Sequence, residues 1–476
     1  MTAQTILPAN TLATGGYEID NSCRFNGDAY VHKAVVAGNQ RTFTYSFWTK
    51  RSTLNGYQTF IGYAQSAGGG GSTNRGELIF VGDGDDTLRV GFNPGASSWS
   101  NYTMNTGVFR DTSAWYNIVL KLNTTNGTAS ERLKIFVNGV SQGLDGYPGQ
   151  NFDTGFNVDG YVYHVGRSAS GTGNFLKGYL AEAVFIDGTA LDADSFGEFD
   201  EDSGIWKPID VSGLTFGNNG FHLDFEASGN LGNDANGGTD FTEVTLAATD
   251  QSTDTCTNNF ATFNPLNNLG SNIAYSEGNL VITPGTSDYK TCISSIAVDS
   301  GKWYAEFKAV SGHNGSTDVS VGIVGADDHI ASTGSKAMSA YLSSFSYGSG
   351  GLVKKYNDST IRTDATYTDD DIIGIAVDMD NLKLYWSKNG TYNNSGDPTS
   401  GATGTGAVAI TPAQLYYIAV ATISSGGVKV FAANFGSPPY SESGGNSDAD
   451  GHGNFLTAPP SGYFALNTKN LAEYGG

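Results

Sequence analysis

Residues Asp371–Gly390, DIIGIAVDMDNLKLYWSKNG, predict a β-hairpin and, with it, the fold class of the chain. Two runs in which apolar residues alternate with others surround the turn signal Met379-Asp380-Asn381, and a second tight turn follows at Lys388-Asn389-Gly390. Successive side chains of a strand point to opposite faces, so each run offers every second residue to a core. The residues expected there are Ile373, Ile375, Val377, Leu382, Leu384 and Trp386.

The composition favours the same class of structure. Of 476 residues, 65 are glycine, aromatic residues make up 12% and charged residues only 15%. This mixture is rich in turns and in residues that suit β surfaces, and poor in helix formers. We therefore expect an all-β protein with two antiparallel, jelly-roll-like β-sandwiches in tandem. The one helical signal, after Asp192, predicts one or two turns that Gly197 limits.

The charge balance excludes several classes of partner. The chain has 47 acidic and 25 basic side chains, a net charge of −22, and no cluster of Lys or Arg. We therefore expect neither nucleic-acid binding nor docking on an anionic membrane. No signal peptide and no run of about 18 apolar residues is present, so neither classical secretion nor membrane insertion is predicted. Cys23, Cys256 and Cys292 are too widely spaced for a disulfide framework or a metal knuckle.

Residues 1–247 are expected to form the first domain. Strands are predicted at 43–50, 77–81, 88–92, 115–122, 133–137, 161–165, 179–186 and 221–225. Four segments carry a resemblance: FTYSFW (43–48), AWYNIV (114–119), LKIFVNG (133–139) and FLKGYLAEAVFI (175–186). In this order they resemble the laminin-G/pentraxin-like branch of the concanavalin A-like sandwiches.

Residues 248–262 are polar and unpatterned and are interpreted as a linker, residues 263–470 as the second domain, and residues 471–476 as a C-terminal tail. The second domain surrounds the hairpin with SGKWYAEF (300–307), VGI (321–323), LYY (415–417) and VKVFAANFG (428–436). These segments resemble a SPRY domain, and that resemblance implies binding rather than catalysis.

The two domains in this order resemble proteins of tailed bacteriophages, such as tail fibres and other surface appendages. The resemblance implies a non-enzymatic protein of the virion surface, made in the host cytoplasm, that contacts other virion proteins and binds a host glycan or surface protein. By analogy with fibres, a homotrimer is expected. Two alternatives stay open: a capsid-decorating or tail-adaptor subunit without a host ligand, and a polysaccharide depolymerase.

Catalytic patterns are missing, and we predict no catalytic residue. A glucanase on such a sandwich needs two carboxylates, typically as Glu-x-Asp-x-Glu on one strand. The strand 179–186 holds only Glu182, and Asp224 and Glu226 form a lone alternating pair, so all three are interpreted as solvent-facing. The histidines show no HxH or HExxH spacing, and no GxSxG elbow lies on a strand-to-helix turn.

One turn is a candidate calcium site, and no other cofactor is expected. Asp83, Asp85 and Asp86 lie close together in the glycine-bearing turn GDGDD (82–86). Calcium takes about six to eight oxygen ligands, and some laminin-G-like domains hold it between loops. The alternative, which we favour, is a plain hairpin turn between the strands at 78–81 and 88–92.

Aromatic residues in loops are the candidates for ligand binding, because an aromatic ring can stack on the apolar face of a sugar. Trp99 and Tyr102 lie in the polar stretch SSWSNY (97–102). Tyr341, Phe345, Tyr347 and Tyr356 lie in the region that corresponds to partner-binding loops of SPRY domains. Each of these residues could instead belong to a core. The strand residues Trp48, Trp115, Trp303 and Trp386 are assigned to packing.

The N-terminal arm is a candidate for attachment to the virion. Its apolar residues Ile6, Leu7 and Leu12 could dock in a groove or add to a sheet edge, and Pro8 disfavours a helix there. The alternative is a frayed terminus. Deleting residues 1–12 is expected to leave both sandwiches folded and to abolish incorporation into particles.

Overall fold

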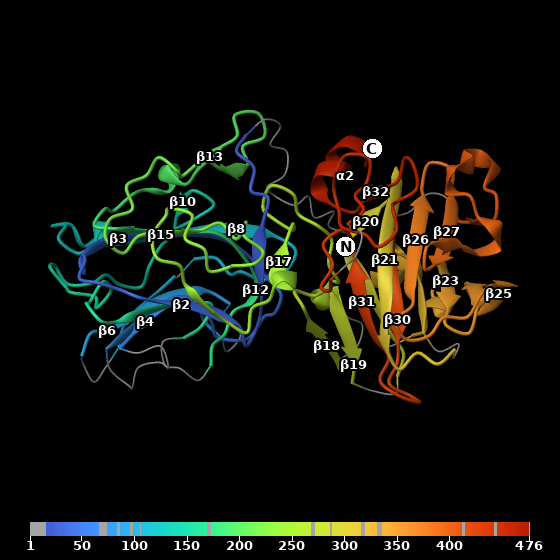
Figure 1. Ribbon diagram of the computed structural model, residues 1–476, viewed down its shortest axis with the longest axis horizontal. Helices are drawn as coiled ribbons and strands as arrows, with labels where there is room; N and C mark the ends of the chain where they lie inside the picture. Colours follow the sequence, from blue (N-terminus) through green and yellow to red (C-terminus); the bar gives the residue numbers. More distant parts are fainter. Residues whose placement is uncertain are drawn as a thin grey trace. The chain divides into compact units, whose positions relative to one another are not determined.

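The computed structural model describes residues 16–65, 74–82, 86–95, 99–104, 106–168, 173–267, 272–285, 288–315, 319–330, 336–411, 415–441 and 445–475. The chain forms two compact units, and the boundary lies between Thr257 and Asn258. We call them domain 1 and domain 2. Both are built from antiparallel sheets, as the all-β prediction requires (Figure 1). In the described residues, the only α-helices are α1 (Ala326–Ile330) and α2 (Thr468–Tyr474).

Domain 1 is a sandwich of two sheets, which Figure 1 shows as two layers. In the described residues the larger sheet has eight strands, in the order β10 (Val140–Ser141), β9 (Leu133–Val137), β8 (Trp115–Asn123), β3 (Thr42–Arg51), β12 (Lys177–Asp187), β1 (Ser22–Asn26) and β17 (Gln251–Ser252), with β15 (Phe221–Leu223) beside β12. The other has seven strands: β16 (Thr242–Val244), β2 (Tyr30–Ala34), β11 (Val162–Val165), β4 (Gln58–Ala64), β5 (Arg75–Phe80), β6 (Leu88–Asn93) and β7 (Ser100–Thr103).

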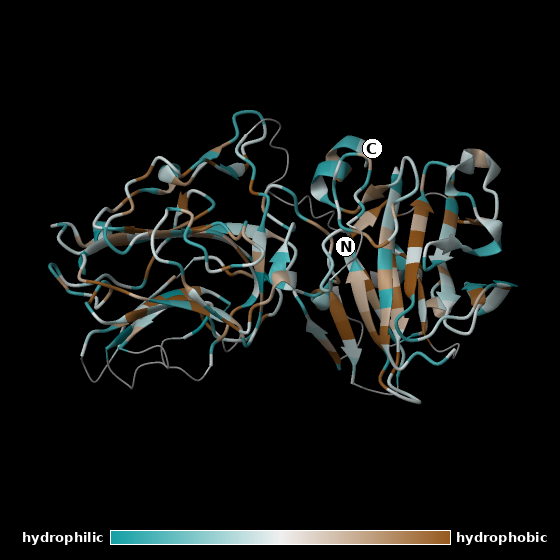
Figure 2. Ribbon diagram, in the orientation of Figure 1, coloured by the Kyte–Doolittle hydropathy of each residue, from teal (hydrophilic) through white to brown (hydrophobic). Residues whose placement is uncertain are grey.

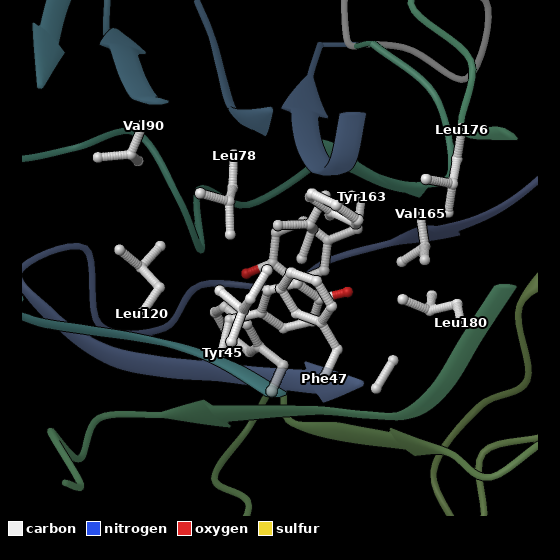
Figure 3. Close-up of a cluster of buried hydrophobic side chains, with 14 of the residues drawn as sticks. Tyr45, Phe47, Leu78, Val90, Leu120, Tyr163, Val165, Leu176 and Leu180 are labelled. Carbon is white, nitrogen blue, oxygen red and sulfur yellow. The ribbon is translucent and has the colours of Figure 1, made fainter. Parts of the chain in front are cut away.

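The core of domain 1 lies between these sheets. Figure 3 shows Tyr45 and Phe47 of β3 pointing toward side chains of the seven-stranded sheet, among them Leu78 and Tyr163. All four are completely buried. Such alternating aromatic side chains supply most of the apolar area that a sandwich buries.

A second apolar layer covers the outer face of the eight-stranded sheet. Trp48, Trp115 and Tyr179 of that sheet pack there with Trp206 from the small hairpin of β13 (Gly197–Phe199) and β14 (Trp206–Pro208). The helical turn expected after Asp192 is a single 3-10 turn, Ala193–Ser195, that leads into this hairpin. The assignment of the strand tryptophans to packing is confirmed for Trp48 and Trp115.

Domain 2 is also a sandwich, and Figure 2 shows its strands as the most apolar part of the unit. In the described residues one sheet has nine strands: β18 (Ile273–Ser276), β19 (Val281–Pro284), β31 (Val430–Asn434), β21 (Lys302–Ser311), β26 (Ile372–Asp378), β27 (Lys383–Lys388) and β28 (Thr391–Tyr392), with β29 (Val408–Ala409) beside β27 and β32 (Phe464–Ala465) beside β21. The other has six: β20 (Lys290–Val298), β30 (Tyr416–Thr422), β22 (Ser320–Gly325), β23 (Ser344–Gly348), β24 (Leu352–Lys355) and β25 (Ser359–Thr363).

The hairpin predicted from Asp371–Gly390 is confirmed as β26 and β27. Ile375 pairs with Trp386, so both side chains face the core between the sheets. The Trp386 indole N–H donates a hydrogen bond of 3.1 Å to the carbonyl of Val321 in the opposite sheet. The hairpin therefore joins the two layers of domain 2 through a polar contact as well as through apolar packing.

Residues 248–262, interpreted from the sequence as a linker, are largely buried. Residues 251–252 form β17, which pairs with β1. Asp254 forms an ion pair of 2.7 Å with buried Lys50 and accepts a 3.1 Å hydrogen bond from the Trp115 indole. The polar side chains of this segment serve as partners inside the fold, which composition alone cannot distinguish from solvent exposure.

The expected C-terminal tail is likewise part of domain 2. Residues 471–474 belong to α2, where Asn467 accepts a hydrogen bond of 2.9 Å from the backbone N–H of Asn470 at the helix start. The ring of Tyr474 stacks on Phe464 at a centroid distance of 3.7 Å. The helix therefore anchors the end of the chain to the sheet.

Candidate functional site

A cavity of about 320 Å³ lies on the outer face of the seven-stranded sheet of domain 1. Leu78 and Phe80 of β5 point into the core, so the alternate residues Arg75 and Glu77 lie on the outer face. On β6 the same alternation leaves Arg89 and Gly91 outside. The cavity is lined by Arg75, Glu77, Arg89, Trp99, Asn101, Ser168 and Asn174, and we call it the Trp99 cavity.

Gly91 lies where three strands meet at this cavity. It pairs with Glu77 of β5 on one side and with Asn101 of β7 on the other. A Cβ atom at Gly91 would lie 2.7 Å from Asn101 Oδ1 and 2.9 Å from Trp99 Cε3. The missing side chain therefore makes the room that the Trp99 ring and the Asn101 amide occupy.

Trp99 is partly exposed and carries a guanidinium over its ring. The Arg75 guanidinium carbon lies 4.9 Å from the ring centroid, within the range of a cation–π contact. Trp99 directly precedes β7, whose residues Asn101 and Thr103 follow on the same face. The prediction placed Trp99 in an exposed polar stretch, and the structure brings it together with charged and amide groups.

Glu77 is the buried carboxylate of the Trp99 cavity, only 7% exposed. Its Oε2 accepts a hydrogen bond of 2.8 Å from the Ser168 hydroxyl. Burial raises the pKa of Glu77, whereas the Ser168 hydrogen bond and the charges of Arg89 and Arg75 oppose that rise. The cavity therefore offers a strong acceptor between two cationic donors.

Aromatic and histidine side chains continue across the same face on β2 and β11. His32 and His164 are direct cross-strand partners, with ring centroids 6.1 Å apart. The Arg167 guanidinium lies 4.2 Å from the centroid of the Tyr30 ring, and Phe175 lies 6.2 Å from that ring. Burial and the charge of Arg167 lower the pKa of His32. We call these residues the Tyr30 cluster. Ser168, the residue that follows Arg167, links this cluster to Glu77.

Three of the predicted ligand-binding aromatics pack against residues of their own domains. Tyr102 points toward the core of domain 1, where its ring lies 6.2 Å from that of Phe92. Tyr347 is completely buried in the core of domain 2, and Tyr341 is buried beside Met338 on the outer face of the six-stranded sheet. Phe345 is buried as well. For Tyr341 and Tyr347 the assignment as surface ligands is corrected, because neighbouring residues cover their rings. Tyr102 is partly exposed, and its role in binding stays a prediction.

Tyr356 remains a candidate. It is 46% exposed and borders a cavity of about 440 Å³ on the outer face of the six-stranded sheet of domain 2. Lys354 and Asp358, which form an ion pair of 2.8 Å, line the same cavity. The rings of Tyr289 and Tyr356 line this cavity, and its charge pair is already satisfied, so it offers fewer unpaired charged groups than the Trp99 cavity.

Asp86 does not have the role predicted for a calcium ligand. Its carboxylate pairs with Arg51 at 3.1 Å and with Arg110 at 3.3 Å, and it accepts a hydrogen bond from the Asn55 backbone. Its charge is therefore balanced inside domain 1. Asp83, Asp85 and the attachment residues Ile6, Leu7, Pro8 and Leu12 lie outside the described residues. Within the described ranges, no group of three or more His, Cys, Asp or Glu residues is arranged to hold a metal ion.

Glu182 was expected to face solvent but is buried. It lies at a bulge of β12 with φ of 48°, and its Oε2 is 2.8 Å from Nε2 of His222. Burial lowers the pKa of His222, but the Glu182 hydrogen bond and charge outweigh it, so the pKa is raised overall. The contact between Glu182 and His222 stabilises the pairing of β15 with β12. Asp224 accepts a 3.1 Å hydrogen bond from the Glu226 backbone nearby in sequence.

Sequence reasoning missed most of the Trp99 cavity, although a signal for it exists. In RGELIF (75–80) and LRVGFN (88–93), charged residues alternate with apolar ones on two consecutive strands. Outward-facing charges on paired strands predict a polar patch on one face. The sequence alone does not give the pairing register of these two strands, which places Gly91 beside Glu77.

Residues 25–195, all within domain 1, match the family described as the Concanavalin A-like lectin/glucanases superfamily. Among solved structures, the chain is similar to the SPRY domain of human HERC1 (18% identity, TM-score 0.28, 36% of this chain and 96% of that chain). It is also similar to a putative carbohydrate binding protein from Bacteroides ovatus (17%, 0.33, 48% and 58%) and to the CBM40 of a Ruminococcus gnavus IT-sialidase (13%, 0.25, 34% and 94%). At these identities and TM-scores the structural similarities carry no argument about function. No curated protein matches the chain.

In the part of the chain that the structure describes, no helix is long and apolar enough to cross a membrane.

Proposed function

We propose that domain 1 binds carbohydrate in the Trp99 cavity. The observation that carries the proposal is a partly exposed indole beside a carboxylate, an amide and two guanidinium groups around one cavity of about 320 Å³. A sugar offers an apolar face to an aromatic ring and hydroxyl groups to such polar side chains. The match of residues 25–195 to a family whose description includes lectins supports the same conclusion.

The test is a glycan array probed with the whole chain and with matched variants. Trp99→Ala removes the ring and is expected to weaken binding at least about tenfold, since stacked aromatic groups dominate such sites. Gly91→Ala is expected to weaken binding as well, because the new Cβ would lie 2.9 Å from the Trp99 ring. Phe199→Ala is the control, because Phe199 is an aromatic residue of domain 1 that is 50% exposed and outside the Trp99 cavity.

Loss of binding in Trp99→Ala and Gly91→Ala with retention in Phe199→Ala would support the proposal. Equal binding by all four proteins would contradict it. Release of reducing ends from a bound polysaccharide, abolished by Glu77→Gln, would instead favour the depolymerase alternative.

We also propose that this carbohydrate-binding domain is displayed on a phage virion, in contact with other virion proteins. The support is the sequence resemblance of the two tandem domains to phage appendage proteins. Soluble protein that competes with phage adsorption would support a role in host attachment, and Trp99→Ala should then fail to compete. Unchanged adsorption, together with particles that lose stability when the gene is deleted, would favour the structural-subunit alternative. Native mass measurement tests the expected trimer.

A further inference from the structure

Two arginines line the Trp99 cavity without a carboxylate in direct contact. The ion pairs of the described residues involve Arg41, Arg51, Arg110 and Arg362, but neither Arg75 nor Arg89. The Nε of Arg75 is buried and has no hydrogen-bond partner in the described part of the chain. A buried guanidinium N–H without a partner costs free energy, so a ligand that accepts from it would bind favourably.

The strand register brings the two arginines to opposite ends of the cavity. Glu77 pairs with Gly91, Arg75 lies two residues before Glu77 on β5, and Arg89 lies two residues before Gly91 on the antiparallel strand β6. Each arginine is therefore about 7 Å along the strands from Gly91, on opposite sides of it. The side chains of both arginines line the Trp99 cavity, so both can approach a group bound there.

The net charge of the residues around the Trp99 cavity is opposite in sign to that of the chain as a whole. Arg75, Glu77 and Arg89 together carry a net positive charge, whereas the chain carries −22. A local positive site on an acidic protein selects an anion, because the surrounding charge repels anions elsewhere on the surface. Planar guanidinium groups bind carboxylates in a two-hydrogen-bond geometry that lysine cannot reproduce.

We propose that the ligand of the Trp99 cavity is an acidic sugar whose carboxylate is bound by Arg75 and Arg89. This inference rests on the proposed carbohydrate binding and names the substrate class. The carboxylate of the sugar accepts from the two guanidinium groups. Its hydroxyl groups donate to Glu77 and bond with Asn101, and an apolar part of the ring contacts Trp99.

The Tyr30 cluster indicates that the ligand is an oligomer. Its residues Tyr30 and His32 lie on β2, three strands away from β5, because the sheet order runs β2, β11, β4, β5. Neighbouring strands are about 4.8 Å apart, so β2 and β5 are separated by roughly 14 Å, more than one sugar ring spans. Tyr30 and Phe175 are partly exposed rings, whereas Arg167, which lies over the Tyr30 ring, is only 5% exposed. A chain of sugars that reaches from Trp99 to Tyr30 would contact both ends.

The experiment measures binding of the whole chain by calorimetry to galacturonate, mannuronate and sialic acid oligomers, each beside its methyl ester. The ester keeps the sugar and removes the charge. At least one acidic oligomer should bind at least about tenfold more tightly than its ester, because charge-assisted hydrogen bonds are lost in the ester. Arg89→Gln should remove that preference, and Arg75→Lys, which keeps the charge, should reduce it.

Arg41→Gln is the matched control, since it removes the same charge from a side chain that pairs with Asp153 outside the Trp99 cavity. The Arg75 guanidinium contacts the Trp99 ring, so a change at Arg75 also alters the surroundings of that ring. Arg89→Gln removes a guanidinium from the cavity and leaves this contact in place. An arm with dextran sulfate, which carries sulfate groups and no carboxylate, separates carboxylate recognition from general attraction between charges.

Preference for the acid over its ester, lost in Arg89→Gln and kept in Arg41→Gln, would support the inference. Equal binding of acid and ester that still depends on Trp99 would overturn it and leave carbohydrate binding intact. Dextran sulfate binding as tight as that of the carboxylated oligomers, with Arg75→Lys unchanged, would overturn the carboxylate claim in favour of simple charge attraction. No binding to any of these glycans or to a glycan array would overturn both proposals.

Discussion

The two domains each hold a buried glutamate on a strand, and the two side chains differ in how their oxygens are satisfied. In domain 1, Glu77 accepts a hydrogen bond of 2.8 Å from the Ser168 hydroxyl and borders a cavity. In domain 2, Glu306 of β21 is completely buried. Burial raises the pKa of both carboxyl groups.

The oxygens of Glu306 are fully occupied by groups of its own domain. Oε2 accepts from the Leu456 backbone N–H and Oε1 from that of Thr457, each at 2.9 Å. The Tyr304 hydroxyl donates at 3.0 Å and the Asn434 amide at 3.3 Å. These bonds attach the segment at 456–457 to the sheet.

The difference separates a structural carboxylate from one with capacity for a ligand. Burial and a raised pKa are common to both glutamates, so neither property identifies a binding site on its own. The distinguishing features are unsatisfied hydrogen-bonding groups and empty volume next to the carboxylate. Glu77 has both, through the Nε of Arg75 and the volume of the Trp99 cavity that it lines.

The largest effect expected from this comparison is on the stability of domain 2. Glu306→Ala leaves the part-buried backbone N–H groups of Leu456 and Thr457 without an acceptor, which should cost up to about 6 kcal/mol at about 1–3 kcal/mol for each donor. Urea unfolding followed by tryptophan fluorescence measures the change. Glu306→Gln keeps one acceptor oxygen and should lose less. An unchanged unfolding midpoint in Glu306→Ala would show that the Glu306 bonds do not hold that segment.

The corresponding change in domain 1 should alter binding more than stability. Glu77→Gln keeps an acceptor for Ser168 and removes a buried charge, so the free energy of unfolding should change by less than about 1 kcal/mol. Binding of a sugar should fall several-fold, since a neutral amide is a weaker acceptor for hydroxyl groups. Unfolding and calorimetry of the same variant measure both effects. A large loss of stability with unchanged affinity would place Glu77 in the same structural class as Glu306.

The smallest expected effect is on the pH dependence of stability. Because burial raises the pKa of Glu77, the folded state prefers the protonated form, and the resulting stabilisation is complete below the unfolded pKa of about 4.3. It is lost as pH rises through the folded pKa. The stability of Glu77→Gln relative to the natural chain should therefore increase between about pH 4 and pH 7. Thermal unfolding at several pH values measures this trend, and the opposite sign would contradict it.

The sequence predicts the elements of this fold better than the roles of individual surface residues. The Asp371–Gly390 hairpin is readable because its turn and its alternation agree, and Ile375 and Trp386 lie in the core as expected. Strand alternation also fixes the faces of Arg75 and Glu77. These are local properties of the chain.

The remaining features depend on long-range pairing that composition does not contain. Residues 248–262 are polar, yet Asp254 is buried against Lys50 from a strand about two hundred residues earlier. Tyr347 lies in a region that resembles a binding loop, yet its ring lies 5.3 Å from that of Tyr367 inside the core. The register that brings Gly91, Glu77 and Trp99 together likewise depends on pairing between strands. Of the residues that line the cavity, only Trp99 was therefore predicted from the sequence.

The most direct test of the central claim is a nuclear magnetic resonance titration of the indole N–H signals with a glycan that the chain binds. The chain has 6 tryptophans. Of these, Trp48, Trp115, Trp206, Trp303 and Trp386 are at most 5% exposed, whereas Trp99 is partly exposed at the cavity. The account predicts that the Trp99 signal shifts and that the five others stay in place. A shift of the Trp206 signal, or of any other buried indole, with Trp99 unchanged would contradict the claim that the Trp99 cavity binds the glycan.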